Sequence, residues 1–273
     1  MLTTLLSYIK YKSLNATILE EKDPLELNME EALILIEKRK EYDKNKKTNK
    51  MKKINLLSSF PKSKRSLKER NVNKKNIQIA LKYSKEYFDG NRSQGYGGYY
   101  YDGRWVKVVR KIIKLFKLKN NSKFLDVGCA KGFLIHDLKT ILPKVKIYGI
   151  DISRYAKDNS ISSIKKNIKI MNCKKLKYKS NFFDGLVAIN VVHNLDLKEC
   201  KKAIKEIQRV SGGKAFIQVD AYRNELELKV LKKWILTAKT YLKPNEWVKL
   251  FKECGYTGYY DFTILKKNKL LKL

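Results

Sequence analysis

Apolar positions along the chain fall into two kinds of pattern, and together they predict the elements of one large fold. Segments with apolar residues at helical spacing are predicted to form amphipathic helices. Short continuous apolar runs are predicted to form strands covered on both faces, which is typical of parallel sheets. The predicted helices span residues 76–88, 104–118, 133–142, 154–166 and 196–210, and the predicted strands span 123–128, 146–151, 168–172, 184–192 and 213–220.

The order of these segments indicates a fold class. From residue 123 onward, predicted strands alternate with predicted helices. Such alternation is typical of a doubly wound α/β domain, whose ligands bind at the carboxyl ends of the strands. The stretch before it is rich in lysine and poor in apolar residues, which favours a solvated linker. We therefore expect a fragment at 1–50, a lysine-rich linker at 51–75 and an α/β domain at 76–273.

The composition limits the classes of protein to be considered. A chain of 273 residues can bury one substantial core and carry a smaller appendage. The longest apolar run, at 185–192, is far shorter than a bilayer span. The first residues lack the charged leader and the cleavage site of a signal peptide. We therefore expect a cytoplasmic protein without membrane insertion.

Soft metal ligands are few in this sequence. It contains 4 cysteines, none of them in a C-x-x-C pair, and 2 histidines. This spacing favours neither a zinc site nor a disulfide framework, and we expect no metal.

The formal net charge of +34 invites a nucleic-acid interpretation. Almost all of the excess is lysine, in a chain that is also rich in isoleucine and asparagine, as an AT-rich coding sequence would produce without selection for a basic surface. Arginine, the better ligand for phosphates and bases, is scarce. Nucleic acid is therefore a possible partner but not the favoured one.

The first predicted strand of the α/β domain and its turn carry the main chemical motif, "FLDVGCAKGF" at 124–133. Gly128 and Gly132 permit a tight turn and a close backbone approach to a ligand. Asp151, 19 residues beyond Gly132, ends the second strand and can accept hydrogen bonds from both hydroxyls of a ribose.

Two alternative interpretations of this motif are an NAD-type fingerprint and a purely structural turn. The spacing is G-x-x-x-G rather than G-x-G-x-x-G, and Asp126 stands two residues before the first glycine. A carboxylate beside the turn suits a ligand with an ammonium group better than a pyrophosphate. This pattern favours S-adenosylmethionine.

Five stretches, taken in order, resemble the class I S-adenosylmethionine-dependent methyltransferases. They are "EYFDGNRSQGYGGYYYDGRW", "LDVGCAKGFLIHDL", "INVVHNL", "VDAYRNE" and "GYTGYYDF", and they are similar to a bacterial subgroup marked by GYGGYxYDGRW. The resemblance implies methyltransferase activity and a Rossmann-like doubly wound, mostly parallel seven-stranded sheet with an N-terminal helical, tyrosine-rich cover.

The resemblance also implies a set of cofactor contacts. They are Asp126, Gly128 and Gly132 at the methionine half, Cys129 and Ala130 on the loop, Asp151 on the ribose, Ile152 against the adenine, Asn172 near the adenine amine, and Asn190 facing the methyl-transfer site. Ala130 replaces a glycine that is usual in the wider superfamily. Cys129 is interpreted as a small filler rather than a nucleophile.

The segment "GYGGYYYDGRW" at 95–105, here called the tyrosine segment, packs aromatic side chains onto a flexible backbone. We expect Tyr96, Tyr99 and Tyr101 to close over the sulfonium, because tyrosine faces attract cations and closure excludes water. Arg104 is expected to pair with the cofactor carboxylate or an anionic substrate. The alternative is a structural aromatic plug.

Methyl transfer often needs a base to take the proton of the acceptor. His193 is the candidate catalytic residue, because it follows the fourth strand of the domain; the alternative is that it caps or packs the turn. His136 falls inside the first helix after the loop and is expected to be structural. Asp220, Tyr222 and Arg223 follow the fifth strand and are candidate substrate contacts.

Residues 1–50 do not fit the α/β pattern. The run "YIKYKSLNATILEEKDPLELNMEEALILIEKRK" resembles part of the carboxyl-terminal repeat module of bacterial type I DNA topoisomerases. One interpretation is a DNA-binding appendage, and the favoured one is a fused or mis-assigned fragment.

The leading functional hypothesis is a methyltransferase for a small-molecule or sugar acceptor. The subgroup that the sequence resembles implies a link to surface-polysaccharide biosynthesis. The alternatives are a nucleic-acid methyltransferase, against which the absence of an "NPPY"-type motif counts, and a non-catalytic protein that binds S-adenosylmethionine.

Overall fold

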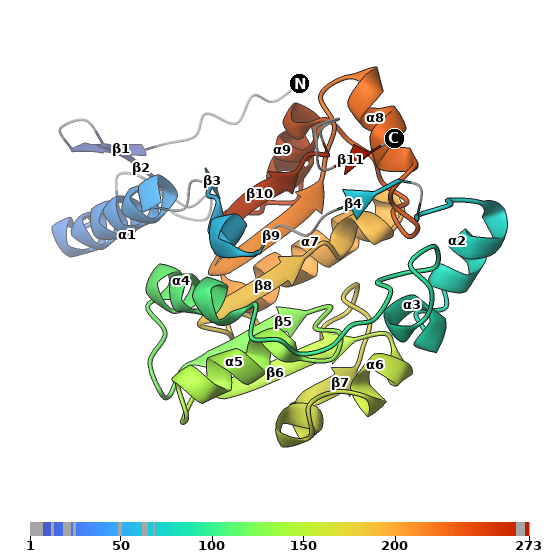
Figure 1. The fold of residues 1–273 in the computed structure, drawn as a ribbon. Coiled ribbons are helices and arrows are strands. Elements are labelled where there is room, and N and C mark those ends of the chain that lie inside the picture. The colour runs from blue at the N-terminus through green and yellow to red at the C-terminus, as the bar shows by residue number, and fades with distance from the viewer. Residues whose placement is uncertain are drawn as a thin grey trace. The chain divides into compact units, whose positions relative to one another are not determined.

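The computed structural model describes residues 8–11, 14–18, 23, 26–48, 51–61, 65–67, 69–265 and 271–272. The chain divides into two compact units, Met1–Lys50 and Met51–Leu273 (Figure 1). No helix among the described residues is long and apolar enough to cross a membrane.

The first unit is a hairpin with a helix. Strands β1 (Tyr8–Tyr11) and β2 (Leu14–Thr17) pair antiparallel, and helix α1 spans Met29–Thr48. Ala16 and Ile36 are buried between them. Asn28 begins the helix: its side chain accepts a hydrogen bond from the Glu31 amide at 3.0 Å, which satisfies one of the unpaired donors of the first turn.

The second unit is built on a seven-stranded sheet in the order β3-β10-β9-β8-β5-β6-β7, with every neighbouring pair parallel. This confirms the Rossmann-like, mostly parallel seven-stranded sheet that the sequence implied. The strands are β3 (Lys52–Lys53), β5 (Lys123–Val127), β6 (Lys146–Asp151), β7 (Ile168–Ile170), β8 (Gly185–Ile189), β9 (Ala215–Asp220) and β10 (Tyr259–Thr263). The short strands β4 (Arg65–Ser66) and β11 (Leu271–Lys272) pair separately.

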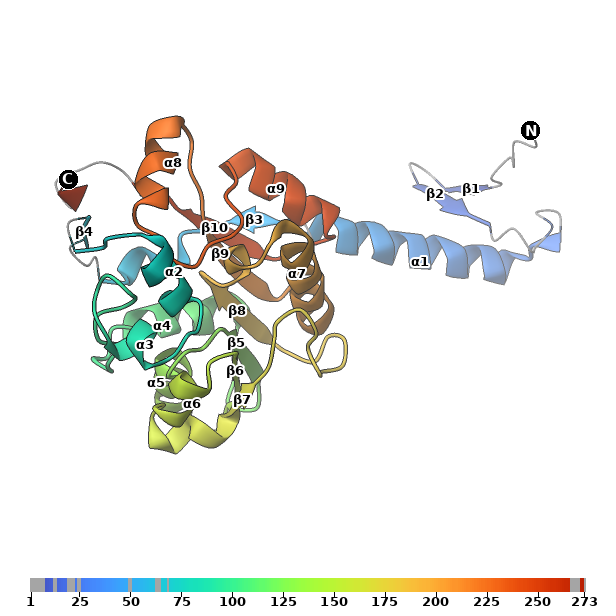
Figure 2. The ribbon, with the colours of Figure 1, turned by 90° about the vertical axis from the view of Figure 1, so that its right-hand side faces the viewer.

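Helices cover both faces of this sheet. They are α2 (Lys74–Ala80), α3 (Lys85–Asp89), α4 (Val106–Phe116), α5 (Phe133–Ile141), α6 (Arg154–Asp158), α7 (Leu197–Ser211), α8 (Glu225–Lys232) and α9 (Pro244–Glu253). Short 3-10 helices span Leu56–Ser59, Ser162–Asn167 and Val192–Asn194. Helices α4 and α5 pack on one face, and α7 and α9 pack on the other (Figure 2).

The pleat of the strands explains why their apolar runs are continuous. Phe124 of β5 joins the core under α4 and α5, while its neighbour Leu125 joins the core under α7 and α9. Successive side chains of a strand point to opposite faces, so a strand covered on both faces needs apolar residues throughout.

Two predicted helices are interrupted. The predicted helix 76–88 divides into α2 and α3, because Tyr83 takes a left-handed φ of +48° between them. The predicted helix 154–166 ends at Asp158. There the side chains of Asn159 and Ser160 bond back to backbone carbonyls, which competes with continuation of the helix.

The expected linker at 51–75 is wrong at its start. Strand β3 adds to the edge of the sheet, where the Ile54 amide donates to the Tyr260 carbonyl at 3.0 Å. Leu56 is 3% exposed in the core under α4. A strand of two lysines has no apolar pattern that would predict it. It forms by pairing with β10, which lies some 200 residues later in the sequence.

We propose that residues 1–50 form a module that the second unit does not need for folding. Both large apolar cores of the second unit consist of residues from Met51 onward. A chain lacking residues 1–50 should therefore unfold in urea with nearly the midpoint of the full chain.

A chain lacking residues 1–61 is the matched control. It also loses β3 and the buried Leu56, and should be less stable by about 2–5 kcal/mol, the usual cost of removing a large buried side chain. Insolubility of the shorter deletion would contradict the proposed boundary.

Candidate cofactor and substrate site

The glycine-rich loop follows β5 at the carboxyl edge of the sheet. Gly128 and Gly132 take left-handed φ angles of +73° and +78°. A Cβ at Gly128 would lie 2.3 Å from Cγ2 of Val191, so only glycine fits there without displacement. The amides of Gly128 and Cys129 both donate to the carbonyl of Ile150, at 2.8 and 3.0 Å, which ties the loop to β6.

Asp151 holds this loop from the end of β6. One carboxylate oxygen accepts from the Ala130 amide and the other from the Ser153 amide, each at 2.8 Å. Burial raises the pKa of Asp151, against the opposing effect of these amides. Ala130 itself has a left-handed φ of +50°, a conformation that glycine would adopt without the cost of about 1–2 kcal/mol.

Asp126 lies on β5 just before the loop and is 5% exposed. Burial, with the nearby Asp151 charge, raises the pKa of Asp126 well above its usual range. Within the described part of the chain, the structure gives the Asp126 carboxylate no hydrogen bond or ion pair. A buried carboxylate costs free energy unless it is paired, so this site gains from a cationic ligand.

The lysine inside the loop pairs with another carboxylate. Lys131, inside the loop, is 7% exposed and donates to both carboxylate oxygens of Asp89, at 2.8 and 2.6 Å. Asp89 also accepts from the Tyr155 hydroxyl at 2.7 Å and from the Tyr99 amide at 3.0 Å. Asp89 thus joins α3, the loop, α6 and the tyrosine segment.

Sequence reasoning missed the role of Asp89, Lys131 and Tyr155. The available signal was that "YFDG" and "CAKG" each place a charged residue directly before a glycine. The pairing itself spans 42 residues of sequence and is visible only in the fold.

Two of the predicted tyrosines lie against the loop. Tyr99 stacks on Phe133, the first residue of α5, with ring centroids 4.8 Å apart and an interplanar angle of 16°. The ring centroid of Tyr96 lies 4.7 Å from that of Tyr99. The pKa of Tyr99 is raised well above its usual range, mainly by burial and further by Tyr96 and Asp126. The Tyr99 ring therefore shares the electrostatic surroundings of Asp126.

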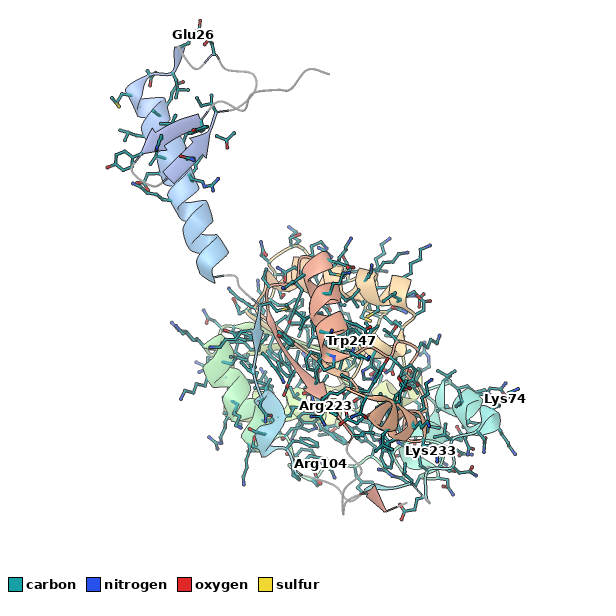
Figure 3. All side chains as sticks on the ribbon, turned by 90° about the horizontal axis from the view of Figure 1, so that it is seen from above. Glu26, Lys74, Arg104, Arg223, Lys233 and Trp247 are labelled. Atoms are coloured by element: carbon teal, nitrogen blue, oxygen red, sulfur yellow. The ribbon has the colours of Figure 1, made fainter. Side chains whose placement is uncertain are left out.

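The ring of Tyr101 also meets Phe133, edge-on with centroids 5.7 Å apart, but the polar groups of Tyr101 and Arg104 have partners outside the loop. The Tyr101 hydroxyl donates to Asp137 on α5 at 2.5 Å. Its ring meets the ring of His136 edge-on, with centroids 5.0 Å apart. The guanidinium of Arg104, labelled in Figure 3, forms an ion pair with Asp102 at 2.6 Å. The sequence could not distinguish which of the clustered side chains turn toward the loop.

His193 follows β8 and is 2% exposed. Its Nδ1 accepts from the Asp220 amide at 3.0 Å, and its Nε2 lies 3.5 Å from the Asp220 carboxylate. Burial lowers the pKa of His193, against the opposing charge of Asp220. Both ring nitrogens therefore face Asp220, as the alternative that His193 packs the turn would require, and a catalytic role for His193 stays a prediction.

The other rim residues are distributed as follows. Tyr222 packs against the apolar cluster around Leu231. Arg223, also labelled in Figure 3, forms an ion pair with Glu227 in the first turn of α8. Asp220 is 13% exposed and is the member of the His193 pair that reaches the rim.

The predicted adenine contacts lie at the ends of β6 and β7. Ile152 is 51% exposed beside Asp151. Asn172 is exposed, and its side-chain oxygen accepts from the Lys174 amide at 3.0 Å. At the end of β8, Asn190 is exposed with a left-handed φ of +57°.

Cys129 is buried, and burial, with Asp126 and Asp151, raises the pKa of its thiol well above its usual range. Its Sγ would lie 2.8 Å from a Cβ at Gly149, so the thiol fills space between loop and strand. This arrangement agrees with a filler and not with a nucleophile.

Comparison with known families now decides the type of domain. Residues 125–217, which contain the glycine-rich loop, Asp126 and Asp151, match the family described as "Methyltransferase domain". This part of the chain is therefore similar to a methyltransferase domain. Residues 7–47 match the family described as "Topoisomerase C-terminal repeat". The methyltransferase domain implies S-adenosylmethionine as cofactor.

Solved structures with a similar fold are distant in sequence. A putative methyltransferase from an antibiotic biosynthesis pathway of Anabaena variabilis is 19% identical, with a TM-score of 0.43 over 55% of this chain and 60% of that one. A putative methyltransferase from Bacillus halodurans is 16% identical, with a TM-score of 0.44 over 54% and 68%. A methyltransferase from Aquifex aeolicus is 26% identical, with a TM-score of 0.32 over 38% and 57%. No curated protein matches the chain.

Proposed function

We propose that the Met51–Leu273 unit transfers a methyl group from S-adenosylmethionine to a small-molecule or sugar acceptor. The observation that carries this proposal is the buried, unpaired carboxylate of Asp126 beside the glycine-rich loop. The link to surface-polysaccharide biosynthesis and a cytoplasmic location are parts of the same proposal, and they rest on the sequence resemblance.

The residues around the loop fit this cofactor. Asp126 would accept hydrogen bonds from the ammonium group of the methionine half, which would offset the cost of its burial. The backbone from Gly128 through Cys129 and Ala130 to Gly132 permits close approach. Each carboxylate oxygen of Asp151 accepts one amide and keeps a second lone pair for a ribose hydroxyl.

The remaining contacts would surround the adenine and the reacting methyl group. Ile152 would cover the adenine and Asn172 would meet its amine, while Asn190 would face the methyl-transfer site. When bound, S-adenosylmethionine supplies an electrophilic methyl group on a sulfonium. Tyr99 and Tyr96 would stabilise that positive charge with their ring faces, each by about 0.5–2 kcal/mol, and would exclude water.

The charges at the carboxyl edge favour a neutral acceptor. Asp151 is the last residue of β6 and Asp220 is the last residue of β9. Asp126 is the second-to-last residue of β5. Beside the bound cofactor, the Asp220 carboxylate would repel an anionic acceptor, whereas a hydroxyl can donate to it. Sugar hydroxyls fit these conditions.

Proton transfer from such an acceptor would involve the His193–Asp220 pair. Asp220 at the rim would receive the proton directly or hold the hydroxyl in line with the methyl group. His193 would act behind it as a positioning residue, because its Nδ1 accepts the Asp220 amide. Tyr222 and Arg223 would then line the acceptor side of the site.

The tyrosine proposal predicts that Tyr99→Leu weakens binding of S-adenosylmethionine more than binding of S-adenosylhomocysteine. The substitution keeps bulk but removes the aromatic face, and only the first ligand carries the sulfonium. The expected difference is about 0.5–2 kcal/mol, or roughly two- to thirtyfold in relative affinity, measured by titration calorimetry.

Tyr101→Leu is the matched control, because Tyr101 turns to Asp137 and His136. It should change the two affinities equally. Equal losses for both ligands in Tyr99→Leu would instead support a structural plug.

The acceptor proposal is tested with labelled S-adenosylmethionine and three panels of acceptors: sugars, small amines and RNA. We predict transfer to a hydroxyl-bearing sugar or another small molecule, and at least a tenfold loss in Asp220→Asn. Transfer to RNA alone would replace the proposal with a nucleic-acid methyltransferase. Cofactor binding without transfer to any panel would favour a non-catalytic protein.

A further inference from the structure

Almost all of the net charge lies in one of the two units. Residues 51–273 contain 51 Lys and Arg and 18 Asp and Glu, a net charge of +33, whereas residues 1–50 contain 10 and 9. The lysine fraction hardly differs, with 43 lysines in 223 residues against 9 in 50. A chain-wide preference for lysine therefore does not explain the difference. The second unit instead lacks compensating acidic residues.

Two stretches of the second unit combine many basic residues with no acidic residue: 103–125, around α4, with 8 Lys and Arg, and 159–183, beside α7. The stretch 159–183 contains 7 lysines and no acidic residue. Its second half runs along α7, which contributes further lysines on its outer side. We define the α7 lysine surface as six exposed side chains: Lys175, Lys177, Lys179, Lys198, Lys202 and Lys205.

The backbone that carries this surface is held in place. Arg209 of α7 donates to the carbonyls of Leu176 and Tyr178, at 2.9 and 2.8 Å. Glu206 accepts from the Leu176 amide at 2.6 Å. The loop and the helix therefore present their lysines as one array rather than as two independent segments.

Three acidic side chains of this region have partners other than the six lysines, and the first, Asp196 at the N-cap of α7, accepts from the Glu199 amide at 2.8 Å. Glu199 forms an ion pair with Lys174, and Glu206 forms one with Arg209 at 2.7 Å. Neither carboxylate neutralises the six lysines of the surface. Repulsion among the six lysines costs free energy in the folded protein, and a bound polyanion would reduce this repulsion.

The spacing on α7 suits an extended ligand. Lys198, Lys202 and Lys205 stand at positions i, i+4 and i+7, which share one face of a helix over about 10 Å. The opposite face, including Ala203 and Ile204, is fully buried in the core.

We propose that the α7 lysine surface binds the phosphate backbone of a nucleic acid. Lysine ammonium groups act as point charges that neutralise successive phosphates and release counterions, without reading bases. A membrane surface is less suitable, because helices that bind membranes present an apolar face for insertion and that face of α7 is buried in the core. This docking surface is separate from the acceptor proposed above.

The test compares two charge-reversal variants of the full chain. Lys198→Glu/Lys202→Glu/Lys205→Glu removes half of the surface. Lys107→Glu/Arg110→Glu/Lys114→Glu changes the net charge equally on α4, which covers the other face of the sheet and exposes all three side chains. Fluorescence anisotropy with a labelled single-stranded oligonucleotide measures affinity at several salt concentrations.

The α7 variant should bind at least about tenfold more weakly than the unaltered protein, and its slope of log affinity against log salt should fall by about 2. The α4 variant should lose much less. Unchanged S-adenosylmethionine affinity in both variants establishes that they are folded.

Equal losses in the two variants would overturn the proposal, since they would mean that only net charge matters. It is also overturned if the protein binds phosphatidylserine vesicles or an anionic polysaccharide through this surface and does not bind the oligonucleotide.

Discussion

The buried carboxylate of Asp126 is the constraint on which the site depends. It stands beside the tight turn at Gly128, with the charge of Asp151 nearby and no ion-pair partner among the described residues. Burial without a partner is unfavourable, and in the proposed function the cationic cofactor would offset this cost. Lys131 of the loop does not pair with Asp126, because its ammonium donates to both carboxylate oxygens of Asp89.

Asp89 therefore has two effects from one position. It fixes a buried cation of the loop, and it accepts the amide of Tyr99, whose ring stacks on the first residue of α5. The conformation of the tyrosine segment and that of the loop are thus joined through a single carboxylate. This connection gives a physical reason for two charged residues, each directly before a glycine, in motifs that lie far apart in sequence.

Sequence patterns predicted the sheet from β5 to β9 because those strands are local and apolar, and the loop motif located Asp126 and Asp151 correctly at its edge. Strand β3 was missed because its stabilisation comes entirely from pairing with β10. The positions of Tyr101 and Arg104 were missed for a related reason: the side-chain partners Asp137 and Asp102 decide where they turn, and composition does not encode direction. For His193, the sequence left catalysis and packing of the turn as alternatives, and it could not show that the ring is buried against Asp220.

The central claim is that an ionised Asp126 binds the positive charge of S-adenosylmethionine, and the pH dependence of cofactor affinity tests it most directly. Because burial raises the pKa of Asp126 in the unliganded protein, binding below that pKa must release its proton. Calorimetry should show affinity rising with pH, by up to about tenfold per pH unit, and levelling above the raised pKa. Asp126→Asn should bind weakly with a much shallower slope, while Asp137→Asn, which alters another buried carboxyl with a raised pKa, should keep the original profile. Affinity that is independent of pH in the unaltered protein, or an Asp126→Asn variant that binds equally well at every pH, would contradict the account.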